Sequence, residues 1–414
     1  MAARTWLMVA GALVMAAGIE VAAGQKQAPP PRLGQFIVIG YNDLGMHCMN
    51  KDFSELMILP PFNTLHAVVV DRSGAKAQII TDGIEVRYSV PDTATPSSVT
   101  NFWKYEEAIF GFKVPRNVGL TGNALSGKMA KGPIDWLATG IPLTPVNHHG
   151  RMATYQLADI TVRRSTKNKP ILAKTRAVVP VSWEIRCDYC HYAPGTTATM
   201  AILQAHDKLH LAKMQEMHPE LLPLTQSTPV VCGTCHRQPE LEPLVVSDDP
   251  TNPTLSAAMH RAHAARLPGY MPSLRNECYA CHPGVVTQCF RDVHASAGMT
   301  CTDCHGGMME VADPNREPWT DLPRCETCHP LAGRPDRAAY QFEQPGTLYR
   351  NSVGHGGMPC VACHNSPHAI LPTLQANDNA QALALQARAG TIGDCRVCHA
   401  SMPSGPFVHA APTP

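Results

Sequence analysis

Fourteen cysteines of this 414-residue chain fall into seven groups with one spacing, Cys-x-x-Cys-His. Two thiols at this spacing can form thioether bonds to a haem while the adjacent imidazole reaches its iron. The motifs therefore predict seven covalently attached haem c groups, each with a proximal histidine. The groups are Cys187, Cys190 and His191; Cys232, Cys235 and His236; Cys278, Cys281 and His282; Cys301, Cys304 and His305; Cys325, Cys328 and His329; Cys360, Cys363 and His364; and Cys395, Cys398 and His399.

Zinc knuckles and redox dithiols are the alternatives, because Cys-x-x-Cys alone serves both. Neither use requires a histidine directly after the second cysteine. With 20 His in 414 residues, chance puts one at a given position about 5% of the time, so seven in seven has odds on the order of one in a billion. The histidines therefore favour haem.

Each iron has a sixth coordination position, which a second histidine, a methionine or a substrate can take. Nine histidines of the motif-bearing half lie outside the motifs, enough to complete seven bis-histidine pairs. They are His206, His210, His218, His260, His263, His294, His355, His368 and His409. Met299 and Met358 also lie close to motifs, although packing is the commoner use of such residues.

Seven of the nine are our distal candidates. His206 with His210, and His260 with His263, are spaced to share a face of a predicted helix, so each pair could serve two adjacent haems.

His294, His355 and His368 complete the set. The first two lie just upstream of a motif in glycine-containing loops, where the backbone can approach a planar cofactor. His355 and His368 flank one motif, and we expect them to ligate haems other than the one attached there.

Cys48 and Cys289 remain outside the motifs. In an exported protein such a couple predicts a disulfide, here between the two halves of the chain. Cys289 also forms a Cys-x14-Cys-His spacing with Cys304, but Cys301 already occupies the normal place.

Soft ligands gather around Cys48, namely Met46, His47, Met49 and His66. They suggest a copper-type site or a distal ligand from His47 to the first haem. A structural cysteine with histidines hydrogen-bonded to backbone is the favoured alternative. His148 and His149 are expected in a turn.

The elements that must position these residues divide the chain in two. Short segments rich in Val and Ile, separated by turn signals, predict an all-β, sandwich-like domain over residues 34–183. A loop-rich, mainly α, heptahaem domain follows over 184–414, in which macrocycles must supply buried apolar surface. Strands are predicted at 35–41, 65–71, 77–81, 84–90, 158–164 and 177–183, and helices at 197–217, 254–267 and 377–390, the last capped by Asp378 and stopped by Gly390.

Residues 1–24 have a basic start, a short apolar run and small residues, which predicts a secretory signal peptide, with 25–33 as a linker. We expect export to the periplasm or the outer surface, with no transmembrane anchor after signal removal. The apolar content of 44% excludes wholesale disorder, and the formal net charge of +1 gives no reason to expect nucleic acid as a partner.

The chain resembles the bacterial multihaem c-type cytochromes used in anaerobic or extracellular electron transfer. The resemblance is carried by the seven motifs, by "GHGGMPCVACHNSPHAI" and, loosely, by "LGMHCMNKDFSELMILPPFNTLHA". It implies electron transfer through closely packed, mostly bis-histidine haems, between a redox protein donor and a protein or external acceptor. Two alternatives are a reductase of a nitrogen or sulfur oxyanion, which needs one open iron, and a subunit of an extracellular cytochrome filament or other oligomer.

Overall fold

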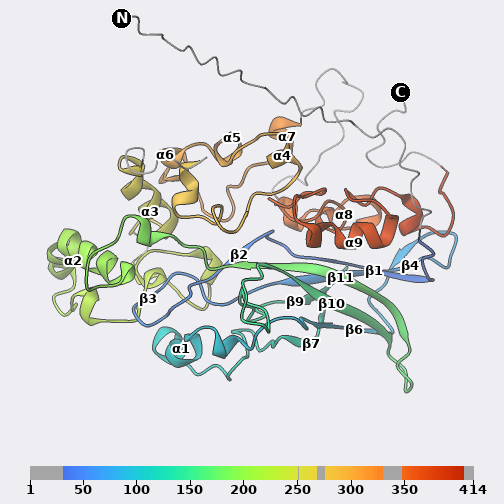
Figure 1. The fold of residues 1–414 in the computed structure, drawn as a ribbon, viewed down its shortest axis with the longest axis horizontal. Helices are drawn as coiled ribbons and strands as arrows, with labels where there is room; N and C mark the ends of the chain where they lie inside the picture. Colours follow the sequence, from blue (N-terminus) through green and yellow to red (C-terminus); the bar gives the residue numbers. More distant parts are fainter. Residues whose placement is uncertain (1–30, 250, 268–275, 330–346, 405–414) are drawn as a thin grey trace, which may run out of the picture.

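The computed structural model describes residues 31–249, 251–267, 276–329 and 347–404, and Figure 1 shows its fold. The predicted signal peptide and most of the predicted linker lie outside these residues. A β-rich region spans residues 36–182, and a region with several short helices follows it.

Two five-stranded sheets make up most of the β-rich region. The first has the order β1 (Phe36–Tyr41), β4 (Leu65–Asp71), β9 (Trp136–Ala138) and β8 (Ala130–Lys131), with β5 (Gln78–Ile79) also paired to β4. The second has the order β2 (His47–Cys48), β11 (Ile171–Ser182), β10 (Tyr155–Arg164), β6 (Ile84–Ser89) and β7 (Ser126–Lys128). A parallel pair, β3 (Leu56–Met57) with β12 (Val230–Val231), joins this region to the helical one.

Alternation of apolar and polar residues explains these strands. In β6 the side chains of Ile84, Val86 and Tyr88 are buried, while Glu85 and Arg87 point to the other face. The predicted strands correspond to β1, β4, β6, β10 and β11, and β5 keeps only two residues of its predicted segment. Helix α1 (Phe102–Phe110) also lies in this region, where the sequence analysis expected only β structure.

Both sheets contribute to one buried apolar cluster, which includes Val38, Val69, Ile160 and Val179. Gly40 of β1 is required at their contact, because a Cβ there would collide with the side chains of Ile160 and Ala177. The two sheets therefore stabilise each other through a shared core.

The second region contains one long helix and several short ones. Its helices are α2 (Ala198–Met217), α3 (Leu255–Ala264), α4 (Val293–Ser296), α5 (Cys301–His305), α6 (Met308–Val311), α7 (Cys325–Cys328), α8 (Cys360–His364) and α9 (Ala376–Gln386). The three predicted helices correspond to α2, α3 and α9. Among the described residues, no helix is both long and apolar enough to cross a membrane.

The predicted cap of the last helix is wrong. Helix α9 begins after Gln375 and ends at Gln386, so Asp378 lies within its first turn and Gly390 lies beyond its end. Asp378 does not cap the helix because its carboxylate is hydrogen-bonded to Arg291.

Helices α8 and α9 lie against the β-rich region, above β1 and β11 in Figure 1. Ile39 and Val68 of the first sheet pack in one apolar cluster with Val361 and Val397, which lie inside the last two motifs. The Gln381 side-chain amide accepts a hydrogen bond from the Gly40 N–H at 2.8 Å and donates one to the Gly40 carbonyl at 2.9 Å. The β-rich region is thus a platform for the last two motifs.

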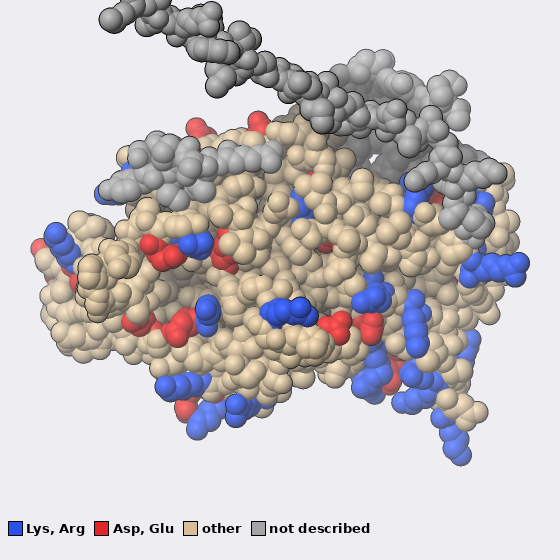
Figure 2. Space-filling view, in the orientation of Figure 1, with Lys and Arg blue, Asp and Glu red and all other residues tan. Residues whose placement is uncertain are grey.

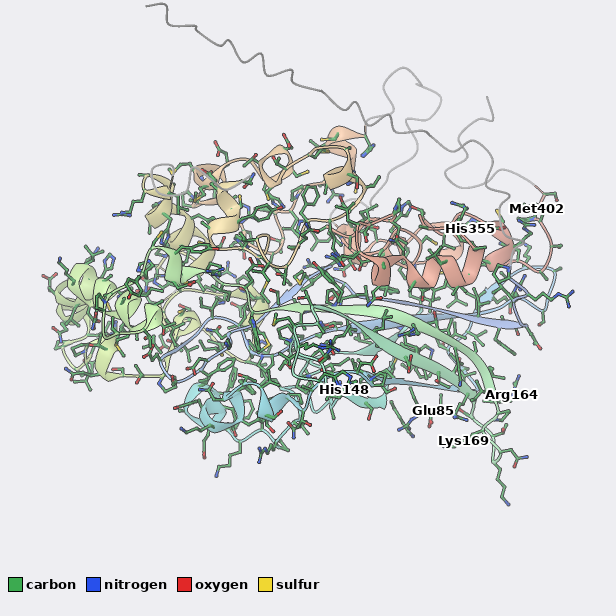
Figure 3. All side chains as sticks on the ribbon, viewed as in Figure 1. Glu85, His148, Arg164, Lys169, His355 and Met402 are labelled. Carbon is green, nitrogen blue, oxygen red and sulfur yellow. The ribbon has the colours of Figure 1, made fainter. Side chains whose placement is uncertain are left out.

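Basic side chains gather where the β10–β11 hairpin projects from the molecule (Figure 2). Figure 3 labels Arg164, Lys169 and Glu85 at this end. Glu85 pairs with Lys128 at 2.8 Å, Arg87 at 3.5 Å and Lys169 at 3.6 Å. The hydrogen bond from Lys128 lowers the pKa of this carboxyl.

A fully buried ion pair connects three parts of the chain. Arg291 donates to the two carboxylate oxygens of Asp378 in α9, at 2.6 and 2.9 Å, and both side chains have 0% exposure. The same guanidinium donates to the Gly45 carbonyl at 2.8 Å and to the Cys289 carbonyl at 3.0 Å, and lies over the Tyr155 ring. The pair joins the β-rich region, the segment before α4 and α9.

We expect Asp378→Ala to lower the free energy of unfolding by about 3–5 kcal/mol, because it leaves the Arg291 charge buried and unpaired. Asp159→Ala is the matched control, since its exposed pair with Arg176 at 3.6 Å is worth at most about 1 kcal/mol. Denaturant unfolding followed by circular dichroism measures both, and equal losses would contradict the expectation.

Candidate haem-binding centres

Each of the seven motifs forms a single helical turn. Residues i, i+3 and i+4 of such a turn share one face, so the two cysteines and the histidine point the same way. The turn is closed in most motifs by the histidine N–H donating to the first cysteine carbonyl, as in His191 to Cys187 at 2.8 Å. The turns are Cys187–Tyr189, Cys232–Thr234, Glu277–Ala280, α5, α7, α8 and Cys395–Val397.

Among the described residues, six of the motif histidines face a histidine from outside the motifs. The ring centroids of all six pairs lie 6.0 to 6.4 Å apart. Two imidazoles that share one metal ion through bonds of about 2 Å have centroids about 6 Å apart, so the pairs fit an iron between them. The pairs are His191 with His263, His236 with His206, His282 with His260, His305 with His368, His329 with His294, and His399 with His355.

The non-motif histidines connect different parts of the chain. His260 and His263 share helix α3 and face two different motif histidines, His282 and His191. His355 and His368 flank the sixth motif, yet face the histidines of the seventh and fourth motifs. Figure 3 shows His355 near Met402 at the C-terminal side and His148 far away in the β-rich region.

The remaining histidines have other surroundings. His210 lies beside His206 on α2, with ring centroids 5.0 Å apart, and does not face a motif histidine among the described residues. His218 lies 3.7 Å from the Glu220 carboxylate. The Nδ1 atom of His364, the histidine of the sixth motif, lies 3.5 Å from the Thr391 hydroxyl. His409 lies outside the described residues.

Burial lowers the pKa of several paired imidazoles. It lowers the pKa of His282 to about 4, with further contributions from His260 and His305. It also lowers the pKa of His368 to about 4, again with a contribution from His305. These rings are therefore neutral near pH 7, the form in which histidine binds metal.

Neighbouring motifs approach each other through their cysteines. The Cys278 and Cys301 thiols interact with each other, and this interaction lowers the pKa of Cys301. Burial raises the pKa of Cys304, and the nearby Cys328 thiol raises it further. The third, fourth and fifth motifs therefore lie close together.

Large apolar side chains are exposed around the first two motifs. Tyr192 is 79% exposed, Leu209 68% and Val246 62%. Such exposure is unusual where a polypeptide core closes by itself, and it fits a region whose apolar surface packs against a macrocycle.

The two candidate methionines pack among apolar side chains. Met299 lines a small space with Tyr279 and Phe290, and Met358 packs against the cluster of β1 and α8.

The soft ligands of the β-rich region do not converge. The His47 Nε2 atom lies 3.1 Å from Asp43, and the His66 Nδ1 atom lies 2.8 Å from Asp135. Both histidines thus bond carboxylates, not the backbone groups we expected. Among the described residues, no group of three or more His, Cys, Asp or Glu is arranged to hold a metal ion. His148 and His149 lie in a turn, as predicted.

Cys48 and Cys289 are both free thiols, so the predicted disulfide is absent. Burial raises the pKa of Cys48 to about 12 and that of Cys289 to about 11, and the two thiols interact electrostatically. The Cys289 Sγ atom lies 3.6 Å from His368 Nδ1. Cys289 is therefore a neighbour of a paired histidine.

We expect Cys48 and Cys289 to resist alkylation in the folded protein, because the thiolate is the reactive form and burial disfavours it. Both should react after unfolding without a reducing agent. Peptide mapping with iodoacetamide, before and after denaturation, measures this. Labelling that required prior reduction would instead support the disulfide.

Most of the polar groups that contact these histidines carry no signal in the sequence. Asp292 could have been found, since it lies two residues before His294 and reaches its Nδ1 atom at 3.3 Å. Arg291, Asp378 and Thr391 carry no local signal, because their partners lie far away in the sequence.

Comparison with protein-family models, with curated proteins and with solved structures gives no significant match.

Proposed function

We propose that this protein transfers electrons through seven covalently attached c-type haems, mostly held between two histidines. The observation that carries the proposal is the set of six imidazole pairs, each with a motif histidine and a ring spacing of 6.0 to 6.4 Å. Haem supplies a one-electron couple at its iron when bound.

The residues of the chain have distinct parts in this function. The motif cysteines attach the cofactors, and the motif histidines are the proximal ligands. His206, His260, His263, His294, His355 and His368 are the distal ligands. The last two motifs are held against the β-rich region, where Arg72 donates to the carbonyls of Arg396 and His399 at 2.7 and 2.8 Å.

Two protein ligands on an iron leave it no position for a substrate, so the paired histidines favour electron transfer over reduction of an oxyanion. The closeness of the third, fourth and fifth motifs also suits transfer between neighbouring centres. The donor is a redox protein, and the acceptor is a redox protein or an external electron acceptor.

The mature protein should have the mass of the processed chain plus seven haems, and the oxidised protein should give low-spin ferric signals. Intact mass spectrometry and low-temperature electron paramagnetic resonance measure these. The reduced protein should bind carbon monoxide poorly. Six or fewer haems would contradict the attachment of haem at all seven motifs. A high-spin signal that corresponds to one haem, together with turnover of nitrite or hydroxylamine, would favour an enzyme.

Replacing one distal histidine should leave one haem iron without its sixth ligand. We expect His355→Ala to keep all seven haems attached and to convert one of them to a high-spin form that binds carbon monoxide. His148→Ala is the control, because this exposed histidine lies in a turn of the β-rich region. Unchanged spectra for His355→Ala would exclude it as a ligand.

A further inference from the structure

The paired histidines differ in what their Nδ1 atoms contact. When Nε2 faces a metal, Nδ1 carries the proton and donates it to a second group, which sets the basicity of the ligand. In α3, His260 donates to the Ser256 carbonyl and His263 to the Met259 carbonyl, each at 2.7 Å. His294 and His368 have different partners.

The partner of His294 is a buried carboxylate. Asp292 Oδ1 accepts from the backbone N–H of His294 and of Ala295 at the start of α4, at 2.8 and 3.2 Å. The other oxygen, Oδ2, lies 3.3 Å from His294 Nδ1. The Asp292 side chain is only 3% exposed, so water screens its charge little. When a carboxylate accepts the Nδ1–H bond, the imidazole becomes a more basic ligand and donates more electron density to the iron. This stabilises the ferric state and so lowers the reduction potential.

The partner of His368 is the Cys289 thiol, a weak hydrogen-bond acceptor. This contact is held by the surrounding backbone, since the Arg291 N–H donates to the His368 carbonyl at 3.1 Å. His368 itself has a positive φ of 65°, a left-handed conformation that its neighbours must maintain. Among the described residues, its Nδ1 atom therefore has no carboxylate hydrogen-bond partner, although the Asp292 charge acts on this ring from farther away.

The two ligands belong to neighbouring centres. His294 faces His329 of the fifth motif, and His368 faces His305 of the fourth motif. The cysteines of these two motifs, Cys328 and Cys304, lie within electrostatic range of each other. A difference in potential between these centres would give one electron-transfer step a direction.

We propose that Asp292 and Cys289 are positioning residues that give these neighbouring centres different reduction potentials. The centre of His294 and His329 has the lower potential, so electrons pass from it to the centre of His305 and His368. This inference rests on the proposed function and adds a direction to it.

Asp292→Asn tests the centre of His294 and His329, which is proposed to have the lower potential. Asparagine still caps a helix, so α4 should remain while the charge on the His294 acceptor is lost. We expect the centre of His294 and His329 to shift to higher potential by more than any other centre, because only His294 is hydrogen-bonded to this carboxylate, with seven low-spin haems retained. Asp321→Asn is the matched control, because this exposed carboxylate lies just before the fifth motif and bonds only the Glu317 N–H among the described residues; its shift should be much smaller.

Cys289→Ser tests the centre of His305 and His368, which is proposed to have the higher potential. A hydroxyl is a better acceptor than a thiol, so a second centre, that of His305 and His368, should shift to lower potential. Cys48→Ser alters a neighbour of Cys289 and not the His368 contact itself, so its shift should be much smaller. In the unaltered protein the centre moved by Asp292→Asn should lie below the one moved by Cys289→Ser. Redox titration followed by visible and paramagnetic resonance spectra measures all four variants.

The outcomes separate this inference from the function on which it rests. Seven low-spin haems with potentials that Asp292→Asn moves no more than Asp321→Asn would overturn the inference alone, as would the reverse order of the two centres. A protein without low-spin haems would overturn the proposed function as well.

Discussion

The separation of about 6 Å between paired imidazoles is the constraint on which the second half of the structure depends. A motif histidine can meet this distance only if a partner from another segment is brought opposite to it. The pairs His305 with His368 and His399 with His355 therefore link segments that are not adjacent in the chain. Short helices and turns suffice to form these pairs, since each of them needs only to place one imidazole opposite its partner.

Polar groups from the rest of the fold hold these segments in place. The Glu184 carboxylate, just after β11, accepts from the backbone N–H groups of Val285, Val286 and Thr287 at 2.7 to 3.0 Å. Burial alone would raise the pKa of Glu184, but the hydrogen bond from the Thr287 hydroxyl and these backbone bonds together lower it. Arg291 and Asp378 add a buried pair nearby. Each of these charges has partners, which is the condition for burying it.

The β-rich region has a conventional apolar core, whereas the helical region has few buried side chains around its first motifs. This contrast is consistent with the proposal that haem supplies apolar surface in the helical region. It also explains why the last two motifs are better packed, since Val361 and Val397 lie in a cluster with Ile39 and Val68.

The local features of this protein follow from its amino-acid sequence. Strands such as β1 and β4 and helices α2 and α3 follow from the periodicity of apolar residues, which acts between residues close in the chain. The sequence also provided the list of candidate histidines, because residue type alone identifies imidazoles.

The tertiary structure alone decided which of these histidines face each other. Nothing in the local pattern distinguishes His206 from His210, yet only His206 faces a described motif histidine. The free state of Cys48 and Cys289, and the use of Asp378 as an ion-pair partner instead of a helix cap, are decided in the same way. The physical reason is that these contacts join distant segments, so they depend on how whole elements pack and not on the residues beside them.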